Sequence, residues 1–271
     1  MPELPEVETT LRGIEPHILN IPINKILVRA KKLRWPIPEK TLKNNLIGNS
    51  FYSINRRAKY LIFKSKLGHL LVHLGMSGCL KILHRFDEPN KHDHLDFVFK
   101  NGTCLRFTDP RKFGSILWTQ DPEKHFLIKN LGPEPLGNSF SGTYLFEKSR
   151  RRKLPIKSFI MNANVVSGIG NIYANEALFL SGIRPQKKTG TISQKQFETL
   201  ALSIKNLLHS SIDQGGTTLR DFVSGNNRPG YFQNELWVYG RSGKNCFSCS
   251  SKLKEIRLAQ RSSVYCPLCQ S

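Results

Sequence analysis

The first residues of the chain carry groups that could do chemistry. The sequence begins Met1-Pro2-Glu3-Leu4-Pro5-Glu6, and a start methionine that precedes a small residue such as Pro2 is normally removed. Removal leaves Pro2 as a free secondary amine with a pKa of about 8, against about 10.4 for lysine. Such an amine is partly unprotonated at neutral pH and can attack a carbonyl or acetal-like carbon to form a cationic Schiff base. Glu3 and Glu6 add two nearby carboxylates, although most N-termini are frayed and do no chemistry.

Four cysteines near the C-terminus have the spacing of a metal site. Cys246 and Cys249 form one C-x-x-C pair, and Cys266 and Cys269 form a second pair after sixteen intervening residues. Two such pairs supply four thiolates for a closed tetrahedral zinc site, which leaves no open position for catalysis. We therefore predict one structural Zn²⁺ in a C-terminal hairpin. Arg261, near the tip of that hairpin, is well placed for a phosphate or a groove.

The composition indicates a polyanionic partner. The 271 residues, enough for one or two domains, include 41 lysines and arginines against 20 acids, a net charge of +21, which favours nucleic acid or an anionic membrane. Membrane is the weaker choice, because no stretch approaches the roughly 18 apolar residues of a spanning helix and no secretion signal is evident. We expect a cytoplasmic protein, in which C-x-x-C pairs hold metal more often than they form disulfides. Cys79 and Cys104 lie in apolar runs and are expected to be inert core thiols.

An N-terminal helix is expected to hold the chemistry in place. Val7, Leu11, Ile14 and Ile18 recur at helical spacing, and Pro16 is expected to end or kink this helix. If the apolar face packs on a core, Pro2 and its neighbouring carboxylates occupy a fixed place.

Short apolar or alternating runs follow and predict strands. They span residues 26–30, 51–63, 69–74, 80–83, 95–99, 105–108 and 116–118. Turn signals separate several of them, notably Asn101-Gly102, which is typical of a hairpin. Closely spaced short strands of this kind favour an antiparallel sandwich or barrel.

Three loops of the β region carry groups suited to DNA. Arg56-Arg57-Ala58-Lys59 is a basic cluster, which a solvated surface would explain equally well. Met76 lies on a Gly-flanked turn, where it either packs into the core or serves as a wedge. The turn Thr108–Gly114 offers Arg111 and Phe113 two residues apart. Together Met76, Arg111 and Phe113 could enter a duplex, which an enzyme needs after it rotates a base out of the stack.

The second half of the chain has a helical texture. Residues 131–137 are rich in Gly and Pro and predict a stiff linker, and Ser193 to Ile212 predict a helix with a Ser193–Gln196 capping box. The glycine-containing turn 167–170 precedes Asn171, and helix N-termini of this kind bind phosphate. Residues 215–231 are expected to form a long loop that acts as a lid.

The motifs resemble those of bacterial formamidopyrimidine-DNA glycosylases over essentially the whole chain. Besides the four-cysteine hairpin, the matching motifs in chain order are Pro2-Glu3-Leu4-Pro5-Glu6-Val7-Glu8, Arg56-Arg57-Ala58-Lys59-Tyr60, His73-Leu74-Gly75-Met76-Ser77-Gly78, Thr108-Asp109-Pro110-Arg111, Gly170-Asn171-Ile172-Tyr173-Ala174 and Gln214-Gly215-Gly216-Thr217-Thr218. The resemblance implies an α+β multidomain fold. Residues 1–130 would form an N-terminal antiparallel β-sandwich with flanking helices, 131–154 a linker, 155–230 a helix-two-turn-helix domain with a lesion-covering loop, and 237–271 a zinc-ribbon β-hairpin.

The resemblance also implies the reaction. The chain would be a monomeric, nucleoid-associated DNA glycosylase and AP lyase of base excision repair. It would excise oxidised purines, namely 8-oxoguanine and formamidopyrimidines, from duplex DNA through a Pro2 Schiff base and nick the strand by β,δ-elimination. Pro2 would attack C1′ of the damaged nucleotide, Glu3 would act as acid and base around the sugar, and Glu6 would assist near the base.

The same resemblance implies a set of DNA-contacting residues. Phosphates around the flipped nucleotide would be held by Lys59 and Arg261, which belong with the catalytic group, and by His73 and Asn171, with Lys157 close by. The hole in the duplex would be filled by Met76, Arg111 and Phe113. The remaining expected DNA contacts are His92, Tyr173 and Arg220.

Two alternatives stay open from the sequence. An enzyme like endonuclease VIII, which prefers oxidised pyrimidines, shares the Pro-Glu start and the zinc finger, but Leu4 and the Arg111–Phe113 turn favour the purine enzyme. A non-enzymatic zinc-ribbon protein that binds DNA or RNA would explain the charge and the cysteines but not the Pro2-Glu3 terminus. Two positions depart from the pattern: Asn162 stands where an aspartate is common, and Arg220 where a lysine is familiar. These departures bear on the substrate preference and not on the reaction class.

Overall fold

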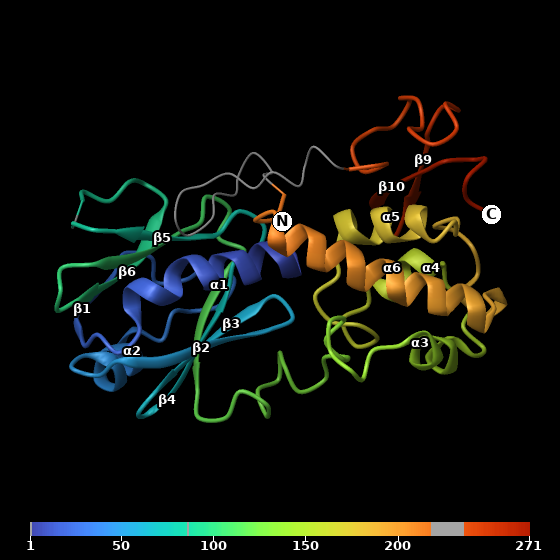
Figure 1. The fold of residues 1–271 in the computed structure, drawn as a ribbon. Helices are drawn as coiled ribbons and strands as arrows, with labels where there is room; N and C mark the ends of the chain where they lie inside the picture. Colours follow the sequence, from blue (N-terminus) through green and yellow to red (C-terminus); the bar gives the residue numbers. More distant parts are fainter. Residues whose placement is uncertain (1, 86, 218–235) are drawn as a thin grey trace. The chain divides into compact units, whose positions relative to one another are not determined.

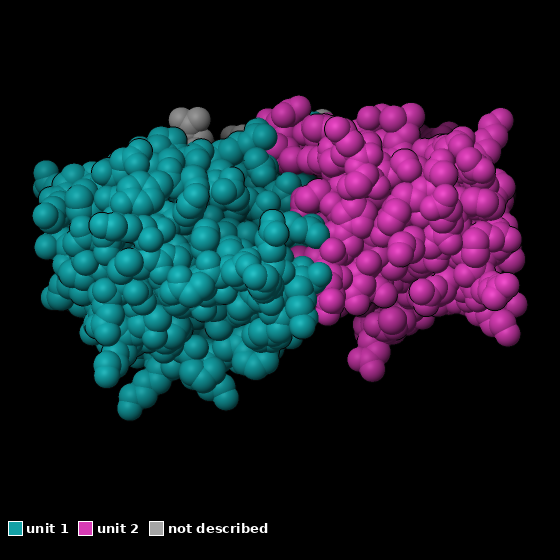
Figure 2. All heavy atoms as spheres, turned by 90° about the horizontal axis from the view of Figure 1, so that it is seen from below, with its two compact units in different colours: residues 1–129, 214–233 teal, residues 130–213, 234–271 magenta. Residues whose placement is uncertain are grey.

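The computed structural model describes residues 2–85, 87–217 and 236–271 (Figure 1). Contacts divide the chain into two compact units, which Figure 2 shows in different colours. Unit 1 comprises residues 1–129 and 214–233, and unit 2 comprises residues 130–213 and 234–271. Among the described residues, no helix is long and apolar enough to cross a membrane.

Unit 1 contains two four-stranded antiparallel sheets, as the strand pattern predicts. One sheet has the order β2-β3-β4-β8 and is formed by β2 (Phe51–Arg57), β3 (Tyr60–Ser65), β4 (Gly68–His73) and β8 (Ser115–Thr119). The other has the order β1-β6-β7-β5 and is formed by β1 (Ile23–Val28), β6 (Asp93–Phe99), β7 (Cys104–Thr108) and β5 (Cys79–Leu83). Apolar side chains from both sheets form one core cluster, so the predicted β-sandwich is confirmed.

The helix α1 (Leu4–Ile18) completes this core. It contacts β2 and β3 of one sheet and β5 of the other, and Figure 1 shows it running between them. Val7, Ile14 and Ile18 are fully buried, which confirms the predicted apolar face. The helix does not end at Pro16 but continues to Ile18. Pro16 lies in the last turn, where it lacks the N–H that would donate to the carbonyl of residue 12, and the helix ends two residues later.

Two local features of unit 1 differ from the sequence prediction. The run 51–63, which predicts one strand, is split into β2 and β3 by a tight turn at Ala58-Lys59, where Arg57 pairs with Tyr60. A short helix, α2 (Glu39–Leu46), was not predicted. Its sequence signals are Pro38 at the N-cap and a Glu39–Lys43 ion pair one turn apart, at 2.6 Å.

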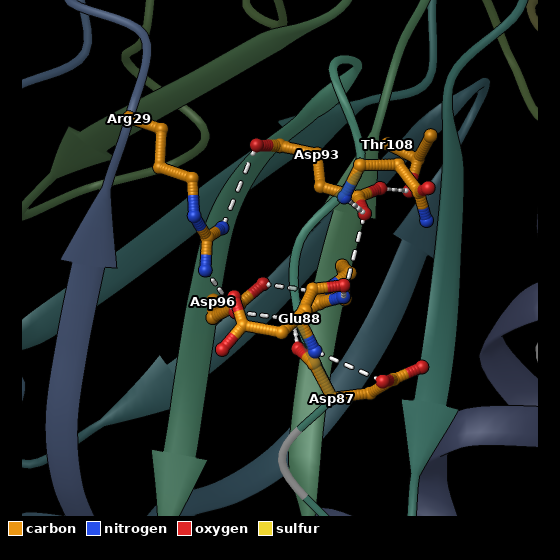
Figure 3. Close-up of polar contacts among 8 residues, drawn as sticks. Arg29, Asp87, Glu88, Asp93, Asp96 and Thr108 are labelled. Atoms are coloured by element: carbon orange, nitrogen blue, oxygen red, sulfur yellow. Dashed lines mark hydrogen bonds and ion pairs between the residues drawn. The ribbon is translucent and has the colours of Figure 1, made fainter.

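A buried ion-pair network stiffens the β1-β6-β7-β5 sheet (Figure 3). The Arg106 guanidinium donates to both carboxylate oxygens of Asp96 at 2.9 Å and to Asp93 at 3.3 Å. Arg29 donates to Asp96 at 2.5 Å, and the Thr108 hydroxyl donates to Asp93 at 2.5 Å. Because each charge is paired and hydrogen-bonded, the burial cost is offset and the end of β7 at Thr108 is held in place.

The two isolated cysteines are buried, as predicted. Cys104 lies in β7 beside Asp96, and desolvation together with that carboxylate raises the pKa of its thiol to about 12. The thiol is therefore protonated and inert at neutral pH.

Unit 2 is helical with a C-terminal hairpin. Its elements are α3 (Gly142–Ser149), α4 (Ile156–Ile160), α5 (Asn171–Leu180), the 3-10 turn Thr189–Thr191, α6 (Gln194–Asp213), β9 (Lys254–Leu258) and β10 (Arg261–Tyr265). The Ser193 hydroxyl accepts from the Gln196 amide and the Gln196 side chain accepts from the Ser193 amide, both at 3.2 Å, which confirms the capping box. The stretch 131–154 carries α3, which packs on α6 within unit 2.

Candidate active site and metal centre

The N-terminus of α1 is buried and fixed. Pro2 is buried, and Glu3 and Glu6 are 2% and 1% exposed. Glu3 caps the helix in an extended conformation, and the Glu6 carboxylate reaches back to accept from the Glu3 amide at 2.8 Å. The predicted nucleophile is therefore held in place and not frayed. The Glu6 carboxylate caps the first turn of the helix, and the apolar face of the helix packs in the core.

The second oxygen of the Glu6 carboxylate binds a segment far along the chain. Glu6 Oε1 accepts from both the amide and the hydroxyl of Thr217 at 2.9 Å. Gly216 has a φ of +82°, and a Cβ there would lie 3.2 Å from Glu6 Oε1, so this close approach favours glycine. The resemblance implies that Glu6 assists near the base, and in the structure its hydrogen bonds join the Glu3 amide to Thr217, at the start of the 215–231 stretch. Arg220 lies outside the described residues.

Lys59 is presented by the β2–β3 turn. Ala58 has a φ of +54°, a conformation that costs a residue with a Cβ roughly 1–2 kcal/mol. Arg56 supports the turn, because it donates to the Ala58 carbonyl at 3.1 Å and to Glu8 of α1 at 2.8 Å. Within the basic cluster, Arg56 thus holds Lys59 to the helix that carries Pro2.

His73, at the end of β4, has a defined tautomer. The Gly75 amide donates to His73 Nδ1 at 2.9 Å, so the ring proton lies on Nε2. Desolvation, with smaller contributions from Lys59 and Arg34, lowers the pKa of His73 to about 4. At neutral pH His73 is an uncharged hydrogen-bond donor, suited to a phosphate oxygen without adding charge.

Three exposed side chains lie on two turns of unit 1. Met76 is 37% exposed and Phe113 is 46% exposed, so Met76 does not pack in the core. The Arg111 guanidinium lies 4.9 Å from the centroid of the Phe113 ring. Lys112 between them has a φ of +54°. His92 is half-buried, and its carbonyl accepts from the amide of Asp109, which begins the second turn.

Asn171 and Tyr173 open α5 in different environments. Asn171 is the first helical residue, and its Oδ1 is buried without a hydrogen-bond partner in the part of the chain that the structure describes. The positive end of the helix dipole at this position favours a phosphate. Tyr173 is 1% exposed and its hydroxyl shares a 2.5 Å hydrogen bond with Ser211, so its ring packs in the core of unit 2.

Lys157 and Arg261 are linked through the hairpin. Lys157 is 1% exposed, and its ammonium donates to the Ser262 carbonyl at 2.5 Å and the Ser263 hydroxyl at 2.7 Å. Arg261, at the start of β10, is exposed. The two residues before it, Ala259 and Gln260, have φ values of +47° and +61°. These contacts place Lys157 as a support for the strand that carries Arg261.

The four cysteines come together as the spacing predicts. The Sγ atoms of Cys246, Cys249, Cys266 and Cys269 all lie within 4.8 Å of one another. Desolvation opposes ionisation of Cys266, but hydrogen bonds from Ser251 and from backbone amides outweigh it and lower its pKa to about 6. Four convergent thiol groups fit tetrahedral zinc, which the cysteines bind as thiolates.

Sequence reasoning missed the groups that attach this hairpin to α5. Glu176 is fully buried, and its carboxylate accepts from the amides of Trp237, Val238 and Tyr239 at 2.7 to 3.0 Å. The Asn175 side chain accepts from the Val264 amide at 2.9 Å. A Glu and an Asn within an apolar helix are the signal that could have found them, because buried polar groups need partners.

Comparisons with known proteins agree with this arrangement. Three family models match: the formamidopyrimidine-DNA glycosylase N-terminal domain at residues 1–116, the formamidopyrimidine-DNA glycosylase H2TH domain at 131–223, and the zinc finger found in FPG and IleRS at 243–271. A formamidopyrimidine-DNA glycosylase of Stutzerimonas stutzeri is 52% identical and one of Pseudomonas aeruginosa 53% identical, each over 100% of both chains.

Solved structures give the same result. A Lactococcus lactis FPG mutant in complex with Fapy-dG-containing DNA superimposes with a TM-score of 0.92, at 35% identity and 99% coverage of each chain. The MutM (FPG) protein of Thermus thermophilus superimposes with a TM-score of 0.89, at 31% identity, over 99% of this chain and 98% of that one. A β-sandwich, an H2TH unit and a four-cysteine finger together define a DNA glycosylase of the zinc-finger class. The chain belongs to the formamidopyrimidine-DNA glycosylase family.

Proposed function

We propose that Pro2 is the nucleophile of this protein, a base-excision repair glycosylase with AP lyase activity. The observation that carries the proposal is the buried, capped N-terminus of α1, where the Glu6 carboxylate fixes the Glu3 amide one residue from Pro2. Once Met1 is removed, the Pro2 amine attacks C1′ of the damaged nucleotide and the N-glycosidic bond breaks. Glu3 supplies and removes protons around the sugar.

Strand cleavage follows from the same intermediate. After the base leaves, the C1′–O4′ bond of the sugar breaks, O4′ takes a proton from Glu3, and an iminium forms between Pro2 and C1′. The iminium acidifies the C2′ proton, and loss of that proton expels the 3′ phosphate by β-elimination. A second elimination expels the 5′ phosphate. One amine thus performs both the glycosylase and the lyase step.

The remaining residues bind and open the duplex. Lys59 and His73 of unit 1, and Asn171 and Arg261 of unit 2, bind backbone phosphates around the extruded nucleotide. Lys157 acts through the hairpin strand that carries Arg261, and Glu6 through the N-terminus. Met76, Arg111 and Phe113 fill the space left in the stack. His92 and Arg220 complete the expected DNA contacts. Tyr173, which is buried with its hydroxyl bonded to Ser211, instead supports the start of α5 from within the core of unit 2.

Further parts of the proposal concern substrate and setting. Oxidised purines, 8-oxoguanine and formamidopyrimidines, are the preferred lesions, and the protein acts as a monomer in the cytoplasm, associated with the nucleoid. The four cysteines bind one structural Zn²⁺. The ion stabilises the folded hairpin that carries Arg261 and takes no part in bond breaking. The division of the chain into sandwich, linker, helical and zinc-finger segments at residues 130, 154 and 230 belongs to the same proposal.

A borohydride experiment tests the nucleophile. The protein is mixed with duplex DNA containing 8-oxoguanine and treated with sodium borohydride, which reduces an iminium to a stable covalent bond. We expect an adduct whose peptide map places the DNA on Pro2. An adduct on a lysine, or none, contradicts the assignment. The same assay with an oxidised pyrimidine measures the lesion preference.

A further inference from the structure

Asp109 is a buried carboxylate at the base of the Arg111–Phe113 turn. It is completely buried and follows the last residue of β7. Its Oδ2 accepts from the Gly114 amide at 2.8 Å, and its Oδ1 accepts from the Arg111 amide at 3.3 Å. One side chain therefore closes both ends of the turn that displays Arg111 and Phe113.

The same carboxylate reaches the second turn. Asp109 Oδ1 accepts from the Ser77 hydroxyl at 2.7 Å, and the Ser77 oxygen also accepts from the Arg111 amide at 3.2 Å. Ser77 is 4% exposed and directly follows Met76. These hydrogen bonds thus join the Met76 turn to the Arg111–Phe113 turn, and burial shields them from solvent.

The two backbones also touch directly at this link. Gly75 has a φ of +67°, and a Cβ there would lie 2.5 Å from the Gly114 amide nitrogen. A Cβ on Gly114 would lie 2.9 Å from the His73 carbonyl and 3.0 Å from Asp109 Oδ2. Because neither glycine leaves room for a side chain, the two backbones pack more closely here than residues with a Cβ would allow.

The Asp109 backbone is anchored as firmly as its side chain. The His94 ring donates from Nε2 to the Asp109 carbonyl at 2.8 Å, and the Asp109 amide donates to the His92 carbonyl at 3.0 Å. The preceding Thr108 is held by Asp93 of the buried ion-pair network (Figure 3). The base of the Arg111–Phe113 turn is therefore fixed to the strands of the sheet.

We propose that Asp109 is a positioning residue that locks the Met76 turn and the Arg111–Phe113 turn into one rigid wedge. Its contacts, all in unit 1, fix the spacing between the apolar tips. The inference rests on the proposed function, in which these tips enter the duplex. A wedge of fixed spacing opens a stacked step without first losing conformational entropy, whereas two independent tips would have to be ordered by the DNA.

The test compares paired and already extruded lesions. Single-turnover excision rates are measured on 8-oxoguanine in a paired duplex and in a single strand, for Asp109→Asn, Ser77→Ala and Phe113→Ala. Asp109→Asn replaces the acceptor facing the Gly114 amide or the Ser77 hydroxyl with an NH2 group, and Ser77→Ala breaks the link while leaving the carboxylate. We expect the ratio of paired to single-strand rates to fall about ten- to a hundredfold in Asp109→Asn and by a smaller factor in Ser77→Ala. The ratio should also fall in Phe113→Ala, which removes one tip of the wedge.

A matched control separates positioning from general instability. Asp96→Asn makes the same chemical change at a fully buried aspartate of β6, whose carboxylate accepts from Arg29 and Arg106 and not from a residue of either turn. It should lower the melting temperature and leave the rate ratio unchanged. A reduced ratio in Phe113→Ala with wild-type ratios in Asp109→Asn and Ser77→Ala overturns the role of Asp109. A wild-type ratio in Phe113→Ala overturns the wedge itself, and a fall in Asp96→Asn equal to that in Asp109→Asn reduces the effect to stability.

Discussion

The N-terminal helix α1 and the C-terminal hairpin β9–β10 hold their functional groups by different means. The start of α1 is fixed by the large core of unit 1, to which both sheets contribute. The hairpin packs through Val264 into a cluster of only six buried residues, which also includes Phe179 of α5 and the cysteines Cys246 and Cys266. So small a cluster cannot offset the entropy of ordering the segment, and metal ligation supplies the difference.

This contrast separates chemistry from binding. Pro2 needs no metal, because burial and capping by Glu6 position it. Arg261 depends on the metal through the strand it begins, although Lys157 and Asn175 attach the hairpin to the rest of unit 2. Changes at the two ends of the chain should therefore fail in different ways.

The largest effect is expected from Pro2→Gly. Removal of Met1 then leaves a primary amine of different basicity and placement, so excision and strand cleavage should fall together, while binding persists through the phosphate contacts. Single-turnover kinetics and a binding assay on the same lesion duplex measure both. Excision at the wild-type rate would remove Pro2 from the mechanism.

Glu3→Gln provides a graded comparison at the same site. Loss of a positioned acid and base typically costs roughly 10²–10⁴-fold. The loss should be larger for base excision than for cleavage at a preformed abasic site, where no base has to leave. Equal losses on the two substrates would argue that Glu3 acts on the sugar steps alone.

Removal of the metal tests the other end of the comparison. Structural zinc contributes about 10–16 kcal/mol in finger peptides, so Cys266→Ser should unfold the hairpin and abolish tight DNA binding. Hydrogen exchange should show the strands of unit 1 still protected. Atomic absorption should find one zinc per wild-type chain, and a metal-free protein that binds DNA normally would refute the zinc site.

A core substitution in α1 should give the opposite pattern. Ile14 is fully buried, and Ile14→Ala should lower the free energy of unfolding by about 2–5 kcal/mol. Zinc content and hairpin protection should not change. Denaturant unfolding and metal analysis on one sample decide this, and loss of zinc from this variant would mean that the two ends are not held independently.

The smallest effect distinguishes Lys59 from His73, two of the residues proposed to bind phosphates. His73 has its pKa lowered to about 4, so it is neutral at pH 8 and loses its ring neutrality only as the pH falls toward that value. Lys59→Ala should reduce the slope of the logarithm of the DNA-binding constant against the logarithm of the salt concentration by about 0.9. His73→Ala should weaken binding but leave this slope unchanged. Titrations at several salt concentrations measure this, and a matching change of slope in His73→Ala would show that the ring is charged when bound.

The features that the sequence predicts are those that local spacing encodes. The C-x-x-C pairs, the Ser193–Gln196 capping box and the apolar face of α1 each depend on residues a few positions apart, and each is found in the structure. The alternation of short strands predicts the sandwich for the same reason. The reactivity expected of the Pro2 amine and the family resemblance likewise follow from the residues themselves.

Tertiary structure alone decided which polar groups serve as supports. Glu6 meets Thr217 across 211 positions, Ser77 meets Asp109 across 32, and Lys157 meets Ser262 across 105. These groups act as positioning elements because a buried polar or charged group is destabilising unless it is hydrogen-bonded. The fold determines which groups lie close enough to form those hydrogen bonds. No local pattern encodes those partners, since they are set by the pairing of distant strands and helices.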